Sequence, residues 1–121
     1  MFPTKRRLLL VDGEQDITSI LCSVLQESGF EVTSFEDPVL ALKHFKPRYY
    51  DLVILDIRMP NMNGFELYRQ IRRKDNRIKV CFLTAVSEFG EYEQYRKEVY
   101  PKLGERHFVA KPISNDELIK K

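Results

Sequence analysis

Three short apolar runs constrain the fold of this 121-residue chain more than any other feature of its sequence. They are LLLV at 8–11, DLVILD at 51–56 and IKVCFLT at 78–84. Continuous apolar runs of this length are typical of strands buried on both faces of a sheet. The alternating stretch FEVTSF (30–35) and the short stretch HFVAK (107–111) each predict a further strand. The chain therefore has five predicted strands.

The segment after the first strand has the spacing of an amphipathic helix. Its apolar residues recur at every third or fourth position, at Ile17, Ile20, Leu21, Val24 and Leu25. Ser28-Gly29 is expected to end this helix, because glycine suits the left-handed conformation that often follows a helix C-terminus. We therefore expect these five apolar side chains to face the core.

Four more helices are predicted after the remaining strands. Asp37-Pro38 is a cap and first-turn pair for the second helix, and Ser114 with Glu117 forms a capping box for the last. The inward-facing residues of the three helices between them are Val39, Leu42 and Phe45; Gly64, Leu67, Tyr68 and Ile71; and Phe89, Tyr92, Arg96 and Val99. Strands that alternate with helices need parallel crossovers, so we predict a doubly wound α/β sheet with helices on both faces.

Composition excludes several classes of protein. Twenty Lys and Arg against eighteen Asp and Glu give a net charge of +2, which is too even to indicate nucleic-acid or membrane binding. No apolar run reaches the length of a membrane span, and the N-terminus lacks the apolar core of a signal peptide. The isolated Cys22 and Cys81 argue against a structural zinc site. A reducing, cytoplasmic setting is expected.

One basic run, RQIRRKDNRIK at 69–79, stands out against this even balance. It admits two interpretations, a nucleic-acid footprint or a solvated helix end. Cations are favourable near the carboxyl end of a helix, so we interpret the run as a solvated helix end.

Four polar residues fall at or just past the carboxyl ends of predicted strands: Asp12, Asp56, Thr84 and Lys111. In parallel sheets, ligands bind beyond these ends, so the four residues are expected to converge. Carboxylates suit Mg²⁺, while lysine and threonine suit phosphoryl oxygens. No Ser-His or Cys-His pair is evident, which makes an aspartate carboxylate the expected nucleophile.

The stretches LLLVDGEQDI, DLVILDIRMPNMNGFEL, CFLTA and FVAKP occur in that order, each at a predicted strand end. Together they resemble the receiver domain of two-component response regulators, a CheY-like domain, over essentially the whole chain. The resemblance implies a flavodoxin-like strand order 2-1-3-4-5 and a single receiver domain over residues 1–121. The last predicted helix is short, so either an output domain follows or the receiver stands alone.

The resemblance also implies roles for residues near the first and third strands. Asp56 is the expected phosphoacceptor. Asp12, Asp56 and the backbone carbonyl of Arg58 are the expected Mg²⁺ ligands, with Glu14 as a further candidate.

Residues near the last two strands take the remaining roles. By resemblance, Thr84, Ala85 and Lys111 contact the phosphoryl group, and the peptide between Lys111 and Pro112 is cis. Thr84 and Phe108 are the expected switch residues.

Gly13 departs from the family, in which the first strand normally ends in two adjacent acids. The second acid usually touches the metal, so one ligand is missing here. Glu14 could reach back, Asp12 could move in, or a water could fill the position, and each would weaken Mg²⁺ binding. Alternatively, Arg58 could pair with Asp12 or Asp56 and replace part of the metal's role. Considered alone, Asp12 could simply cap the following helix, and Glu14 could be a solvated first-turn acid.

The expected function is a phosphorylation-controlled switch that takes a phosphoryl group from a sensor histidine kinase or phosphotransfer protein. Phosphorylation would change the face formed by the fourth helix, fifth strand and fifth helix, which could serve a homodimer or an output domain. The chain would catalyse only its own phosphorylation and dephosphorylation, and would bind neither nucleic acid nor membrane. Arg58 and Val86 are expected to influence the lifetime of the phosphorylated form.

Three other functions were weighed against this switch. Gly13 favours a pseudo-receiver that acts as a phosphorylation-independent interaction module. An aspartyl phosphatase ranks last, because such enzymes commonly need an acid at the position that Arg58 occupies. Neither a P-loop nor G-x-G-x-x-G is present in the sequence, which argues against a nucleotide-binding enzyme.

Overall fold

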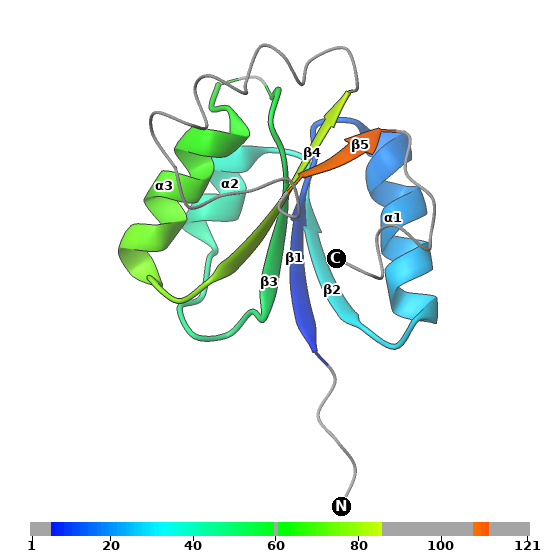
Figure 1. Cartoon of the computed structure of the whole chain (residues 1–121), viewed down its shortest axis with the longest axis horizontal. Helices are drawn as coiled ribbons and strands as arrows, with labels where there is room; N and C mark the ends of the chain where they lie inside the picture. Colours follow the sequence, from blue (N-terminus) through cyan, green and yellow to red (C-terminus); the bar gives the residue numbers. More distant parts are fainter. Residues whose placement is uncertain (1–5, 60, 86–107, 112–121) are drawn as a thin grey trace, which may run out of the picture.

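A computed structural model describes residues 6–59, 61–85 and 108–111 of the chain. Its strands form one parallel sheet in the order β2-β1-β3-β4-β5 (Figure 1). The strands are β1 (Arg7–Val11), β2 (Glu31–Phe35), β3 (Leu52–Asp56), β4 (Lys79–Ala85) and β5 (Phe108–Lys111). The predicted doubly wound sheet and its strand order are confirmed.

Three helices cover the two faces of this sheet (Figure 1). They are α1 (Gln15–Glu27), α2 (Pro38–Lys43) and α3 (Gly64–Lys74). Helix α1 packs on one face, while α2 and α3 pack on the other. The predicted fourth helix, around residues 89–99, and the last helix, from residue 114, lie outside the described residues.

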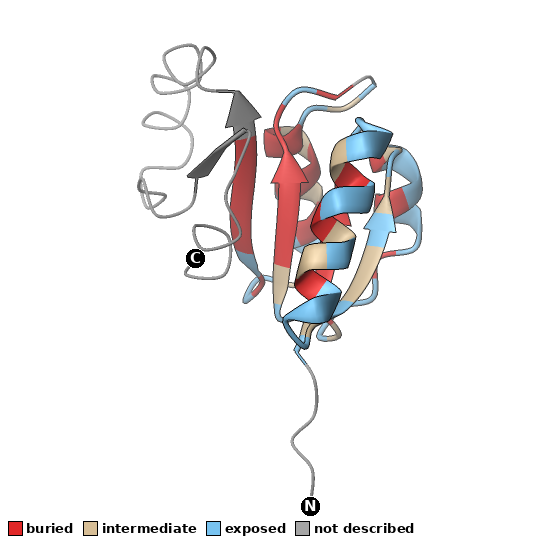
Figure 2. Cartoon of the chain, turned by 90° about the vertical axis from the view of Figure 1, so that its right-hand side faces the viewer, coloured by how far each residue is buried: buried red, intermediate tan, exposed pale blue. Residues whose placement is uncertain are grey.

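The central strands are buried on both sides because successive side chains point to opposite faces. Leu9, Val11, Val53, Leu55 and Phe82 join the cluster beneath α2 and α3. Their neighbours in sequence join the cluster beneath α1, and these are Leu8, Leu10, Ile54, Cys81 and Leu83. Figure 2 shows this burial concentrated in the strands and in the helix surfaces turned toward them. Cys81 is a core residue, as predicted.

The predicted inner face of α1 is partly wrong. Leu21 and Leu25 are buried, but Ile20 is 63% exposed, and the buried side chain in its place is Thr18. Successive residues advance about 100° around a helix, so a face centred on Leu21 and Leu25 leaves Ile20 at its outer edge. The helix ends as expected, with Gly29 at a φ of 96°.

Helix α2 also differs from its predicted face. Asp37 caps it by accepting a hydrogen bond from Val39 N at 2.8 Å, as the sequence indicated. The Val39 side chain, however, is 47% exposed, and Pro38 and Ala41 are buried instead. The helix has only six residues and ends before Phe45, so the spacing of a longer helix does not apply.

Helix α3 has the predicted inner face. Gly64, Leu67, Tyr68 and Ile71 are all buried. Phe65 is an additional core residue, and its ring centroid lies 4.8 Å from that of Phe82 on β4. Within the residues that the structure describes, no helix has both the length and the apolar composition needed to cross a bilayer.

The corrected face of α1 can be tested with two neighbouring truncations. We expect Leu21→Ala to lower the free energy of unfolding by about 2–5 kcal/mol, because it leaves a cavity under the helix. Ile20→Ala should change it by no more than about 0.5 kcal/mol, because that side chain is exposed. Urea unfolding followed by circular dichroism measures both, and equal losses would contradict the assigned face.

Candidate functional site

The candidate site lies where β1 and β3 end. Val11 pairs with Leu55 in the sheet, so the next residue of each strand, Asp12 and Asp56, is carried to the same edge. Asp12 is 0% exposed and Asp56 is 4% exposed, although both are carboxylic acids. Burying charged groups is unfavourable unless the site compensates them, so this placement is typical of a functional site.

Glu14 completes a group of three carboxylates. One ligand oxygen from each of Asp12, Glu14 and Asp56 lies within 4.8 Å of the other two. The turn that carries the first two is fixed by hydrogen bonds: Glu14 N donates to Asp12 Oδ1 at 2.9 Å. Thr18 Oγ1 contacts the carbonyl oxygens of Asp12 at 3.1 Å and Glu14 at 3.0 Å. The N-cap residue of α1 is Glu14, so the alternative that Asp12 caps this helix is wrong.

This donor set fits a hard divalent cation such as Mg²⁺. Mg²⁺ prefers oxygen ligands at about 2.1 Å in octahedral geometry, which places them about 3 to 4 Å apart. The observed spread of up to 4.8 Å is only slightly wider, so small side-chain adjustments would bring the oxygens around one ion. A divalent cation would also relieve the mutual repulsion of the three carboxylates.

Gly13 lies between two members of this group and is exposed. It supplies no side-chain oxygen, whereas the exposed Glu14 places a carboxylate within reach of both buried acids. Of the alternatives that the sequence left open for the missing ligand, this geometry favours Glu14. The metal-binding role of each residue stays a prediction.

The sheet register brings the remaining predicted residues to the same edge. Asp56 pairs with Leu83 on β4, so Thr84 follows immediately beyond it. Thr84 pairs in turn with Ala110, and Ala85 pairs with Lys111. The backbone thus places Thr84, Ala85 and Lys111 on the two strands beyond Asp56, as the strand-end argument predicted.

The other switch and peptide predictions are less accessible. Phe108 opens β5 and pairs with Phe82 in the sheet. Its role as a switch residue stays a prediction. Pro112 and Val86 lie outside the described residues, so the cis peptide and the predicted effect of Val86 stay predictions as well.

The loop after Asp56 is closed against the start of α3. Gly64 N donates to the carbonyl oxygen of Ile57 at 2.7 Å. A Cβ atom on Gly64 would collide with the Asp56 carbonyl oxygen and lie 2.9 Å from Ile57 Cα. Between these contacts the chain turns through Asn61 at a φ of 73°, a conformation that asparagine tolerates. Arg58, in the same loop, has an exposed side chain.

Two polar residues at this edge were missed by sequence reasoning. Thr18 sits within the apolar pattern of α1, and nothing in that pattern indicated that its hydroxyl holds the acidic turn. Asn63 caps α3 by accepting a hydrogen bond from Glu66 N at 2.9 Å. An Asn followed three residues later by Glu is a helix-start signal, so Asn63 could have been found.

The electrostatics of the α3 N-terminus are settled locally. Arg69 binds the Glu66 carboxylate through two hydrogen bonds, of 3.0 and 2.6 Å, and Gln70 adds a third at 3.1 Å. The Arg69 hydrogen bonds, followed by that of Gln70, hold the pKa of Glu66 below its ordinary value. Glu66 is therefore engaged within its own helix.

Comparison with known proteins identifies the family. Residues 8–121 match the response regulator receiver domain. The Escherichia coli (strain K12) transcriptional regulatory protein CreB is 36% identical over 109 residues, which cover 90% of this chain and 45% of CreB. The structure of Vibrio cholerae CheY4 matches with a TM-score of 0.80 at 30% identity, covering 97% of this chain and 95% of CheY4. Thermotoga maritima TrrA, in complex with Mg(2+)-BeF, matches with a TM-score of 0.74 at 36% identity, covering 95% and 94%.

The chain therefore belongs to the response regulator receiver domains of two-component signalling. It spans less than half the length of the curated transcriptional regulators that it matches, for example 45% of CreB. Receiver domains typically bind Mg²⁺ in an acidic pocket, and the family interacts with sensor histidine kinases. The predicted family membership is confirmed.

The close approach of Gly64 to the Asp56 backbone gives a direct test of the loop geometry. We expect Gly64→Ala to lower the free energy of unfolding by about 1–3 kcal/mol, because the colliding atoms belong to the backbone and cannot rotate away. Urea unfolding measures the loss, and amide NMR shifts of residues 56–58 report the displacement.

A control substitution is Gln70→Ala, which lies on the same helix outside the close approach. An Ala at position 64 that left both stability and these amide shifts unchanged would contradict the assigned contact.

Proposed function

We propose that this receiver domain is a working phosphorylation switch with Asp56 as the phosphoacceptor. The observation that carries the proposal is the buried Asp56 carboxylate at the end of β3, grouped with Asp12 and Glu14. The phosphodonor is a sensor histidine kinase, a phosphotransfer protein or a small acyl phosphate. The chain supplies the catalytic groups for its own phosphorylation and dephosphorylation and turns over no other substrate.

In the transfer step, one Asp56 carboxylate oxygen attacks the phosphorus of the donor. The new bond is an aspartyl acyl phosphate, and the bond from phosphorus to the donor nitrogen or oxygen breaks with its electron pair leaving on the donor. Mg²⁺, when bound, supplies positive charge for the phosphoryl oxygens. Water later attacks the phosphorus and restores the carboxylate, with inorganic phosphate as the product.

The other residues at this edge orient and neutralise the transferred group. Thr84 and Lys111 lie on the neighbouring strands, where a hydroxyl can donate to one phosphoryl oxygen and an ammonium can balance the charge of another. The Ala85 backbone lies beside Lys111 in the register. The Arg58 backbone carbonyl, two residues after Asp56, is the proposed metal ligand from the chain itself.

Glu14 takes the place of the side chain that Gly13 lacks. Its carboxylate lies within 4.8 Å of the ligand oxygens of Asp12 and Asp56, close enough to share one cation with them. Because Glu14 is exposed and Asp12 is buried, the binding of this third ligand costs side-chain entropy that a buried acid would not lose. We therefore expect Mg²⁺ to bind, but more weakly than in receivers with two adjacent acids.

Phosphorylation would act as a switch by favouring one of two packings near β4 and β5. A phosphoryl group on Asp56 interacts differently with two positions of Thr84, so it shifts the balance between them. Phe108 at the start of β5 would move with it and change the surface offered to a second copy or an output domain. TrrA, solved in complex with Mg(2+)-BeF, supports the expectation that this fold accepts such a ligand set.

Intact-mass measurement after incubation with acetyl phosphate tests the phosphoacceptor. We expect the mass to rise by one phosphoryl group in the presence of Mg²⁺, and Asp56→Asn to abolish the rise. An adduct that survives in Asp56→Asn would place the acceptor elsewhere.

No adduct from either acetyl phosphate or a phosphorylated histidine kinase would favour the pseudo-receiver that Gly13 suggested. An adduct that forms equally well after the removal of Mg²⁺ would favour Arg58 as the source of positive charge.

A Mg²⁺ titration of the same reaction tests Glu14. We expect Glu14→Gln to raise the Mg²⁺ concentration needed for half-maximal phosphorylation by about tenfold, because a metal ligand is lost. Asp16→Asn, two residues further along the same turn, is the matched control and should leave it unchanged. Gly13→Asp should lower the requirement. Equal effects of Glu14→Gln and Asp16→Asn would mean that Glu14 acts only through its general charge.

A further inference from the structure

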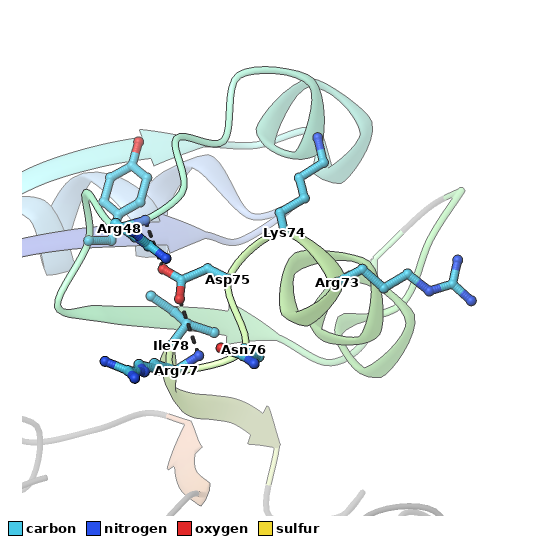
Figure 3. Close-up of a pocket in the computed structure, with 8 residues that line it drawn as sticks. Arg48, Arg73, Lys74, Asp75, Asn76, Arg77 and Ile78 are labelled. Carbon is cyan, nitrogen blue, oxygen red and sulfur yellow. Dashed lines mark hydrogen bonds between the residues drawn. The ribbon is translucent and has the colours of Figure 1, made fainter.

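A basic cleft lies at the end of the sheet opposite Asp56, where β3 and β4 begin. It encloses about 730 Å³ between the loop before β3 and the loop that joins α3 to β4 (Figure 3). Its walls carry four cationic residues, Arg48, Arg73, Lys74 and Arg77, against the single carboxylate of Asp75. The cleft is separate from the phosphoacceptor site, because Asp56 closes β3 at the other edge of the sheet.

The helix dipole explains only part of this charge. Arg73 and Lys74 belong to the last turn of α3, where cations complement the partial negative charge of a helix C-terminus. Arg77 lies beyond the helix, and Arg48 comes from a loop 27 residues before Asp75. The structure therefore adds a distant arginine to the basic run that the sequence showed.

Asp75 holds these two arginines in place without offsetting their outward charge by an ion pair. Its Oδ2 accepts a hydrogen bond from Arg48 N at 2.9 Å, and its Oδ1 accepts one from Arg77 N at 3.2 Å. Both carboxylate oxygens are thus bound to backbone groups of the two loops (Figure 3). Arg48 is held at a φ of 59°, so its backbone conformation is an unusual one that this clip supports. A ligand that binds both side chains would find their backbones already positioned.

The guanidinium groups are the groups available to a ligand. Lys74 Nζ contacts the carbonyl oxygen of Leu42 at 3.3 Å. Among the side chains that the structure describes, no carboxylate forms an ion pair with Arg48, Arg73 or Arg77. Burial raises the pKa of the Tyr50 phenol in the same cleft, so this group stays neutral and adds no negative charge.

We propose that this cleft binds an oligophosphate, either free inorganic polyphosphate or the phosphate chain of a nucleotide. Guanidinium forks match phosphate oxygens with paired hydrogen bonds, and several of them suit a ligand with several phosphates. The volume is in the range of about 300–1,000 Å³ that small-molecule sites occupy. The cations come from three segments around one cleft rather than from a single helix stripe, which favours a compact ligand over duplex nucleic acid.

The test is a titration of the whole chain, without Mg²⁺, with sodium tripolyphosphate. Calorimetry measures the affinity, and amide NMR shifts locate the site. We expect binding, with shifts confined to residues 46–51 and 73–79. Shifts centred on residues 12–18 or 56–64, or no binding at millimolar tripolyphosphate, would overturn the proposal.

Two variants and one control sharpen the result. Arg48→Asn removes a guanidinium with a residue that tolerates the left-handed φ, and Arg77→Gln removes another. Each should weaken tripolyphosphate binding by about tenfold, because a charge-assisted hydrogen-bond pair is lost. Lys43→Gln at the end of α2 removes the same charge outside the cleft and should have little effect. All three variants should still take a phosphoryl group on Asp56 from acetyl phosphate.

Equal weakening by all three variants would mean general electrostatic attraction and would overturn the site. ATP distinguishes the two sources of the ligand. Equal affinity for ATP and tripolyphosphate would mean that the phosphates alone are recognised, whereas tighter binding of ATP would identify a nucleotide. If a duplex oligonucleotide binds more tightly than either and displaces tripolyphosphate, the ligand class is nucleic acid and the proposal is wrong.

Discussion

The structure depends on the burial of β1, β3 and β4 between two layers of helices. Because both faces of these strands are covered, every residue along them is apolar until the strand reaches its carboxyl end. Polar side chains become possible only there, and the parallel register then brings them together. Asp12 and Asp56 are neighbours for this reason, although 44 positions separate them in the sequence. The hydrophobic pattern therefore determines where the chemistry can be.

The same constraint explains which parts of the fold could be predicted. Long apolar runs and their terminal acids define strand positions without ambiguity, so the sheet and the convergence of Asp12 with Asp56 followed from the sequence. The helix faces were harder, because Ile20 and Val39 fit an apolar stripe but lie at its exposed edge. Sequence periodicity gives the direction of a helix face to within about one residue. Packing against the sheet then decides which side chains at the border are buried.

The candidate site was predictable in its parts and less so in its arrangement. Gly13 could be recognised as a departure, but the position of the Glu14 carboxylate depends on how the turn after β1 is held. Thr18 holds that turn from the middle of α1, and its hydroxyl cannot be distinguished from an ordinary helical threonine by spacing alone. Similarly, Arg48 joins the basic run only because Asp75 binds both loops. Such long-range hydrogen bonds leave no periodic signal.

The acidic site and the basic cleft lie at opposite ends of the strands, and this separation gives the molecule an electric polarity that its net charge of +2 conceals. A charged partner experiences this polarity before contact and rotates the domain as it approaches. A cationic partner surface would therefore meet the Asp56 end first, while anions gather at the other. The charge arrangement shortens the search for a productive orientation, and dissolved salt would lengthen it again.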